Sequence, residues 1–296
     1  MTTSRQVWAW WGLSRLLVLI ALISFEHGVG FDLKYYDHSL EDFGSEGFAG
    51  TMREYPLPAV LVLGAPHGLF SLLGVTSGFY LAVIVLAVAL DAAFLRALIG
   101  RSARGDGAPT VPAAVLAWLV ALPAIGAVAY ARFDLLPGVL IGLAVLWLLD
   151  APRRAGIAVA LATGVKYWPA LVIPALAAVR SRRLRFLVAG AAAGAALVLV
   201  SLLLGGWDRI VSPLDYQGDR GLQIESVAAT PAMVGWAFGP ERYDVEYASS
   251  LAWEVDGPGV DVLLRATTLA TIVLLVVLLA LWVAAWRRNV DARSGL

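Results

Sequence analysis

Six long apolar runs dominate the sequence, and they cover residues 7–27, 76–98, 109–130, 134–150, 186–206 and 261–286. A helix of about 20 apolar residues is long enough to cross a hydrocarbon core of about 30 Å. The chain is 60% hydrophobic and its mean hydropathy is +0.78, so a soluble domain of this composition could not solvate its own surface. The sequence therefore predicts an all-α polytopic membrane protein, a single domain over 1–296, with about six full spans.

Two further apolar runs do not fit a simple crossing. Residues 57–74 are interrupted by Pro58, Gly64 and Pro66, which favours a re-entrant or interfacial segment. Residues 156–179 are long enough to cross but carry Lys166 and Pro169 near the middle. Neither run is counted among the six spans.

The arginines predict how the chain is oriented in the membrane. Most of the 22 lysines and arginines lie at the amino terminus, in 96–104, 153–154 and 180–185, and in the carboxyl-terminal tail. The positive-inside rule places these segments in the cytoplasm. Both ends of 156–179 then lie on one side, which predicts a helical hairpin with Lys166 at its tip. We expect a multi-pass protein of the plasma membrane with both termini cytoplasmic and two long outer loops, 28–56 and 207–260.

Polar residues gather on the predicted outer side in five clusters. These are FDLKYYD (31–37), REYPLP (53–58), YARFDLLP (130–137), GVKYWP (164–169) and DYQGDRGLQIES (215–226). Each alone has a simpler explanation, such as a solvated acid, an interfacial ion pair, a snorkelling lysine or a helix start. Charges at membrane depth usually carry function, and five clusters on one side favour a site there. Arg15, inside the first run, is expected to face a polar group or to snorkel.

Several classes of site and partner are not indicated. The chain has no cysteine, which excludes disulfides and thiolate metal sites. His27, His38 and His67 are too scattered for a metal-ligand spacing. The net charge of zero gives no indication of a nucleic-acid partner.

At these clusters the chain resembles the actinobacterial polyprenyl-phosphate-mannose-dependent α-1,2-mannosyltransferases of the GT-C superfamily. The similarity rests on five motifs in register, all read from this sequence: Asp32-Leu33-Lys34-Tyr35-Tyr36, Tyr55-Pro56-Leu57-Pro58, Arg132-Phe133-Asp134-Leu135-Leu136-Pro137, Lys166-Tyr167-Trp168-Pro169 and the full 220–226 stretch RGLQIES. The family pattern has a second proline directly after Tyr-Pro, where this chain has Leu57. By this resemblance the chain is a short member, because the family is expected to have further spans after the last outer loop.

The resemblance implies a GT-C-like fold with an active site on the outer face. It implies inverting transfer of a sugar, mannose in the family, from a polyprenyl-phosphate donor to a lipid or glycan acceptor. Asp32 is the implied general base, with Asp37 and Glu54 as reserves. The implied substrate-binding residues are Tyr36, Tyr55, Arg132, Asp134, Lys166, Trp168, Arg220, Gln223 and Glu225. No cofactor is expected, and a divalent metal at the acidic outer loop stays open. Besides the substrates, the expected partners are membrane lipids.

The implied roles follow from charge and shape. Arg132, Lys166 and Arg220 would face the donor phosphate. Asp134, Gln223 and Glu225 would bond sugar hydroxyls or hold those cations. Tyr36, Trp168 and Tyr216 would offer ring faces for sugar stacking.

Two other functions remain open from the sequence. A transporter or flippase would use intramembrane charges as a substrate path, although no inverted repeat is visible and the polar residues lie on one face. A non-catalytic protein of the same fold would bind lipid-linked sugar without turning it over.

Overall fold

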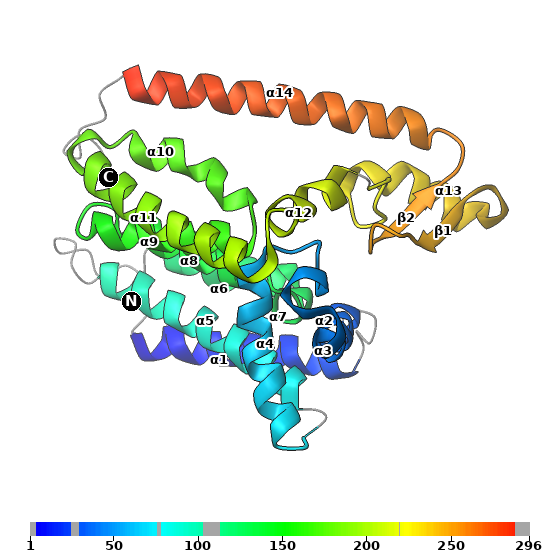
Figure 1. Cartoon of the computed structure of the whole chain (residues 1–296), viewed down its shortest axis with the longest axis horizontal. Coiled ribbons are helices and arrows are strands. Elements are labelled where there is room, and N and C mark those ends of the chain that lie inside the picture. The colour runs from blue at the N-terminus through cyan, green and yellow to red at the C-terminus, as the bar shows by residue number, and fades with distance from the viewer. Residues whose placement is uncertain (1–3, 25–29, 76–77, 103–112, 219, 288–296) are drawn as a thin grey trace. The chain divides into compact units, whose positions relative to one another are not determined.

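The computed structural model describes residues 4–24, 30–75, 78–102, 113–218 and 220–287. These residues form two compact units, divided between Ile210 and Val211, and each unit is described by itself. Within the described residues, four helices are long and apolar enough to cross a membrane. They are α1 (Ser4–Ser24), α5 (Gly78–Ser102), α11 (Arg180–Gly205) and α14 (Val260–Arg287) (Figure 1).

The expectation of six full-length spans is not met in these residues. The runs 109–130 and 134–150 contain α6 (Ala113–Ile125) and α8 (Leu135–Trp147), each of 13 residues and so only about 20 Å long. Helix α6 ends at Gly126, whose φ of +83° suits glycine and not a further helical residue. A short helix, α7 (Val128–Ala131), and an extended Arg132 then lead into α8.

The run 57–74 is one continuous helix, α4 (Leu57–Leu72), and not a broken segment. Pro58 lies in its first turn, where a backbone N–H would have no intrahelical partner anyway. Pro66 lies inside the helix and removes one hydrogen bond without ending it. With 16 residues, α4 is about 24 Å long.

The run 156–179 does reverse direction at Lys166. It contains α9 (Pro152–Val165), a 3-10 helix η1 (Trp168–Val172) and α10 (Ile173–Ala177), and Lys166 itself is extended. A Cβ on Gly156 would lie 2.1 Å from the Phe186 carbonyl oxygen, and one on Gly164 would lie 2.6 Å from Leu197. Helices α9 and α11 therefore run parallel, so the chain between them must return. The sides on which the ends lie stay a prediction.

The predicted outer loops have secondary structure of their own. Segment 28–56 contains α2 (Phe31–Glu41) and α3 (Phe43–Gly50). Segment 207–260 contains α12 (Asp208–Gly218), η2 (Val227–Ala229), α13 (Thr230–Phe238), η3 (Pro240–Arg242), β1 (Asp244–Tyr247) and β2 (Trp253–Asp256). The strands pair antiparallel from Asp244 opposite Asp256 to Tyr247 opposite Trp253, so the chain is not purely helical.

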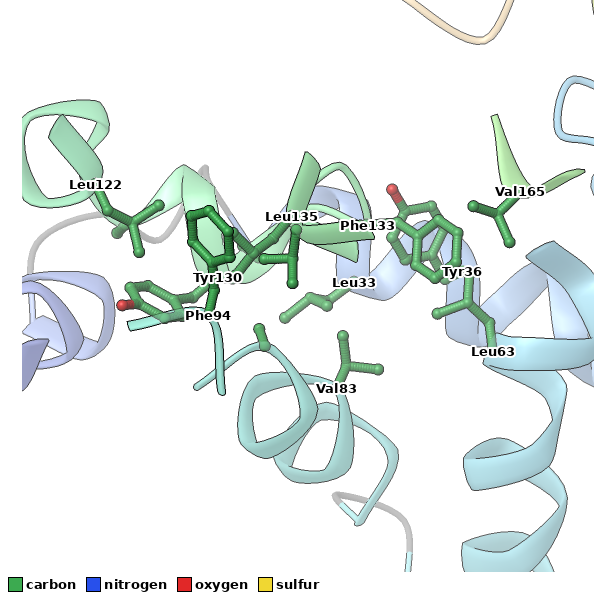
Figure 2. Packing of buried hydrophobic residues seen from close by; sticks show 14 of the residues in the cluster. Leu33, Tyr36, Leu63, Val83, Phe94, Leu122, Tyr130, Phe133, Leu135 and Val165 are labelled. Atoms are coloured by element: carbon green, nitrogen blue, oxygen red, sulfur yellow. The ribbon is translucent and has the colours of Figure 1, made fainter. Parts of the chain in front are cut away.

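The main core of the first unit lies between α1, α2, α4, α5 and the turn that follows α7. It brings together Leu33 and Tyr36 of α2, Val83 of α5, Phe133 of the turn and Leu135 at the start of α8 (Figure 2). This core fixes α2 against the 130–135 turn, which is the arrangement that positions the polar clusters. The outward faces of α11 are mostly exposed and apolar, as expected of a helix that faces lipid.

Candidate active site

Asp32 and Arg132 form an ion pair that joins α2 to the turn after α7. Arg132 Nε donates to Asp32 Oδ2 at 2.5 Å. Asp32 lies in the first turn of α2, where the helix dipole favours a carboxylate. The Arg132 and Asp32 side chains are 35% and 31% exposed, so a ligand can reach the pair.

Lys166 and Asp134 form a second ion pair beside the first. Lys166 Nζ donates to Asp134 Oδ1 at 2.5 Å. Lys166 occupies the extended break after α9, and Asp134 is the N-cap residue directly before α8. Arg132 and Asp134 belong to the same short turn, so the two pairs are neighbours. The structure thus brings together two cations and two carboxylates that were selected from three separate sequence motifs.

Two tyrosines lie next to these ion pairs. The hydroxyls of Tyr36 and Tyr55 are 3.1 Å apart, and Lys166 Nζ lies 5.8 Å from the centre of the Tyr55 ring, in cation–π range. Burial raises the pKa of both phenols, and the carboxylates of Asp32 and Asp134 raise it further, so both stay neutral. The Tyr36 ring is only 1% exposed, so the core covers its faces and its hydroxyl is the group presented to Tyr55.

The segment that carries Glu54 and Tyr55 is held by a buried arginine. Arg209, which is 1% exposed, donates to the backbone carbonyl oxygens of Phe48, Thr51, Met52, Arg53 and Tyr55. Burial lowers the pKa of this guanidinium, and the Glu54 carboxylate opposes that shift. Glu54 is buried and accepts a hydrogen bond from the Tyr35 hydroxyl. Glu54 is thus bonded within the protein, next to the residues whose carbonyl oxygens Arg209 binds.

Two further candidates, the reserve acid Asp37 and the predicted stacking residue Trp168, lie outside the two ion pairs. Asp37 Oδ1 is 2.9 Å from Nδ1 of His67, which lies on α4, and both side chains are less than 20% exposed. Trp168 begins η1 and is 42% exposed, so its ring remains accessible next to Lys166. Asp32, by contrast, is paired directly with the cation of the Arg132 turn.

A comparison with known protein families matches residues 54–295 to "Glycosyltransferase family 87". The matched range covers most of the chain and contains Tyr55, Arg132, Asp134 and Lys166. The chain belongs to glycosyltransferase family 87. Together with its long apolar helices, this makes it a membrane glycosyltransferase, which uses a sugar donor and an acceptor. No curated protein and no solved structure matches the chain.

Three candidate residues of this family 87 glycosyltransferase precede the matched range. Asp32, Tyr36 and Asp37 lie on α2, before residue 54. Their contacts nevertheless lie inside the range, because Asp32 is bonded to Arg132, Tyr36 to Tyr55 and Asp37 to His67. The structure links the amino-terminal motif to the family region by side-chain contacts.

The remaining candidates of the glycosyltransferase belong to the second unit. Arg220 Nη1 lies 3.4 Å from the Gln217 side-chain oxygen, and Gln223 forms a β-bridge with Glu254. The stretch 220–226 runs along β2, with the Val255 amide donating to Leu222 and the Ile224 amide to Trp253. Ser226 ends the stretch by capping η2, and Glu225 lies one residue before it. This motif therefore has a structural role as a partner of β2, and its contact with substrate stays a prediction.

Sequence reasoning overlooked two buried charges of the glycosyltransferase, Arg209 and Asp91. Arg209 follows an apolar run at Gly205 and Gly206 and resembles an ordinary interfacial cation. Asp91 lies within the apolar run 76–98, and a single acid inside such a run was a signal for a buried partner. Arg15 was expected either to face a polar group or to snorkel. It faces Asp91, so the first expectation is confirmed. Among the described residues, no group of three His, Asp or Glu side chains is placed to hold a metal ion.

Proposed function

We propose that this glycosyltransferase moves mannose from a polyprenyl-phosphate donor to a lipid or glycan acceptor, with inversion at the anomeric carbon. The observation that carries the proposal is an accessible cluster of two neighbouring ion pairs. In one Arg132 binds Asp32, and in the other Lys166 binds Asp134. The motif resemblance supports the choice of mannose and of the lipid-phosphate donor. The reaction would take place at the extracytoplasmic face of the plasma membrane, with both termini in the cytoplasm.

The two cations suit a phosphate group. A planar guanidinium can bind phosphate oxygens in a bidentate manner, and a lysine ammonium adds a compact point charge. Both are partly exposed, and each is now neutralised by a carboxylate that a phosphate could replace. A lipid-phosphate donor brings that phosphate to the membrane boundary while its polyprenyl chain stays in the hydrocarbon region.

Replacing the carboxylates would also prepare the base. When the donor phosphate pairs with Arg132, the carboxylate of Asp32 becomes available to the acceptor hydroxyl. Asp32 removes the proton of this hydroxyl while its oxygen attacks the anomeric carbon of the donor. The bond between the anomeric carbon and the phosphate oxygen breaks, and polyprenyl phosphate leaves with the bonding electrons. Arg132 and Lys166 stabilise the charge that develops on that phosphate.

The contacts of the reserve acids favour Asp32 as the base. Glu54 is 8% exposed and bonded to Tyr35, and Asp37 is paired with His67 on another helix. Asp32 is more exposed and lies directly beside a phosphate-binding candidate. A donor whose phosphate binds Arg132 and Lys166 would bring the anomeric carbon of its sugar near this carboxylate.

The test is a transfer assay with purified protein in detergent, using polyprenyl-phosphate-[¹⁴C]mannose and candidate lipid and glycan acceptors. We expect a glycosidic product that depends on the acceptor and is lost in Asp32→Asn. Polyprenyl-phosphate-glucose and a nucleotide-mannose serve as donor controls. Product only from the nucleotide sugar would overturn the lipid-donor proposal. Absence of product with any polyprenyl-phosphate sugar, together with retained donor binding, would favour a non-catalytic binder.

A further inference from the structure

A buried carboxylate in the middle of α5 collects hydrogen bonds from three other helices. Asp91 is fully buried and accepts from Trp11 Nε1 at 2.9 Å, Arg15 Nε at 2.8 Å, Trp118 Nε1 at 2.7 Å and the Tyr130 hydroxyl at 2.6 Å. These donors come from α1, α6 and α7. The network ties the four helices together at a single acid.

Arg15 also donates to two backbone carbonyl oxygens of α6, one of which has no partner within its own helix. Pro123 in α6 has no N–H and so leaves the Leu119 carbonyl without its helical partner. Arg15 Nη1 donates to this Leu119 oxygen at 3.0 Å, and Arg15 Nη2 donates to the Trp118 oxygen at 3.2 Å. Because Arg15 is only 2% exposed, its charge and its hydrogen-bond donors face protein groups. The contacts of Arg15 therefore hold α1 against α5 and α6.

Tyr130 has a different position from the other donors. It lies on α7, a helix of only four residues, two residues before Arg132 and four before Asp134. The turn 132–134 joins α7 to α8 and contacts other segments through the ion pairs of Arg132 and Asp134. Phe133 anchors the turn in the core. The helix just before it is held by the bond from Tyr130 to Asp91, and Tyr130 is fully buried as well. Figure 2 shows Tyr130 and Phe133 in the same hydrophobic cluster.

We propose that Asp91 is a positioning residue for glycosyl transfer, acting through Tyr130 on the turn that carries Arg132 and Asp134. This inference rests on the proposed function, in which those two residues meet the donor phosphate and sugar. The bond from Tyr130 to Asp91 sets how far the turn 132–134 lies from the helix core. It thereby sets the distance between Arg132 and Asp32. Misplacement of a binding group by about 1 Å can cost about 100-fold in rate, so such a support affects turnover.

The experiment compares two variants that each remove one donor from the same oxygen, Asp91 Oδ2. Tyr130→Phe removes the bond next to the site, and Trp11→Phe removes the bond from α1. Both keep an aromatic ring and the Arg15–Asp91 pair. We expect Tyr130→Phe to raise the donor KM and lower kcat so that kcat/KM falls at least tenfold. Trp11→Phe should leave the donor KM within twofold of wild type, although both variants lower the denaturation temperature.

The donor KM separates positioning from general damage, because a smaller folded fraction lowers apparent kcat but leaves KM unchanged. Hydrogen exchange of residues 126–137 gives a second readout that needs no activity. We expect faster exchange there in Tyr130→Phe and wild-type exchange in Trp11→Phe. Equal kinetic losses in the two variants, or unchanged exchange in Tyr130→Phe, would overturn the inference. Inactive wild-type protein would instead count against the proposed function, and the exchange comparison would still decide the positioning role.

Discussion

The guanidinium of Arg132 lies 2.5 Å from the carboxylate of Asp32, although 100 residues of sequence separate them. The contact arises because Leu33 and Tyr36 on α2 pack into the same core as Phe133 and Leu135 beside the turn. Apolar burial on both sides of the ion pair thus brings a base candidate to a phosphate-binding candidate. This relationship determines how variants of either residue should behave.

Asp32→Asn should lower kcat by about 10²- to 10⁴-fold, the usual contribution of a positioned general base. Asparagine keeps the shape and some hydrogen bonding of aspartate but cannot accept the acceptor proton. Donor binding should change little, because Arg132 and Lys166 remain in place. Steady-state kinetics with an isotope-labelled donor measures both quantities. Glu54→Gln is the control acid variant, and a larger kcat loss there than in Asp32→Asn would reassign the base.

Lys166→Ala should raise the donor KM and also lower kcat, because the ammonium faces phosphate in the ground state and in the transition state. Lys34 is the other lysine of the chain and is exposed on α2, which makes Lys34→Ala a matched loss of charge. We expect Lys34→Ala to keep wild-type kinetics. Similar donor KM values for the two variants would remove Lys166 from the phosphate site.

Arg209→Lys should destabilise the first unit. Lysine has three donors on one atom and cannot reach the set of carbonyl oxygens that the guanidinium spans. Hydrogen bonds to charged groups contribute about 1.5–3 kcal/mol each, so we expect the denaturation temperature to fall by roughly 5 °C or more. Thermal denaturation in detergent measures the shift. Arg5→Lys, at an exposed position of α1, should cause no shift, and an equal shift in both would contradict this role.

The sequence indicated which charged residues lie in contact better than it indicated where the helices end. Asp32, Arg132, Asp134 and Lys166 were selected because charged groups beside apolar runs are costly, and the structure brings them together. The helix lengths failed where a run is apolar but contains a turn. Gly126 ends α6 through its backbone conformation, which hydropathy does not record. Pro58 and Pro66 led to the opposite error. They were expected to interrupt the run 57–74, but α4 contains both.

The buried charged residues that bind segments distant in the sequence were the least predictable part of the structure. Arg209 binds carbonyl oxygens more than 150 residues away, and backbone acceptors leave no signature in side-chain patterns. Asp91 could have been paired with Arg15 from their isolation in apolar runs, because each buried charge needs a partner. The β1–β2 hairpin was also detectable, since apolar and acidic residues alternate in DVEY and WEVD. That pattern is short and lies in a segment interpreted as loop.

Alkaline pH should destabilise the fold through the tyrosines of the site. Burial raises the pKa of Tyr35 and Tyr55 above the ordinary value of 10.0, and the Glu54 carboxylate adds to the shift. Below pH 10 both phenols are neutral in the folded and unfolded states, so their contribution is fully present. As the pH rises above 10, only the unfolded chain ionises freely, and stability falls. Denaturation temperatures between pH 8 and 11 should show this decline, and Tyr55→Phe should make it less steep. A wild-type profile that stays flat to pH 11 would contradict the prediction.

The last prediction concerns the orientation of the helical hairpin at Lys166. Helices α9 and α11 run parallel, so the residues just before α9 and at the start of α11 lie at the same end of the pair. Because the chain contains no cysteine, single-cysteine variants report accessibility without background. We expect Ala151→Cys and Ser181→Cys to react with a membrane-impermeant maleimide only after the membrane is opened, as cytoplasmic positions do. Trp168→Cys, at the tip, should react in intact cells. Labelling of Ala151→Cys and Ser181→Cys from opposite sides would show that the segment crosses the membrane, and it would place Lys166 at mid-depth, away from a donor phosphate at the boundary.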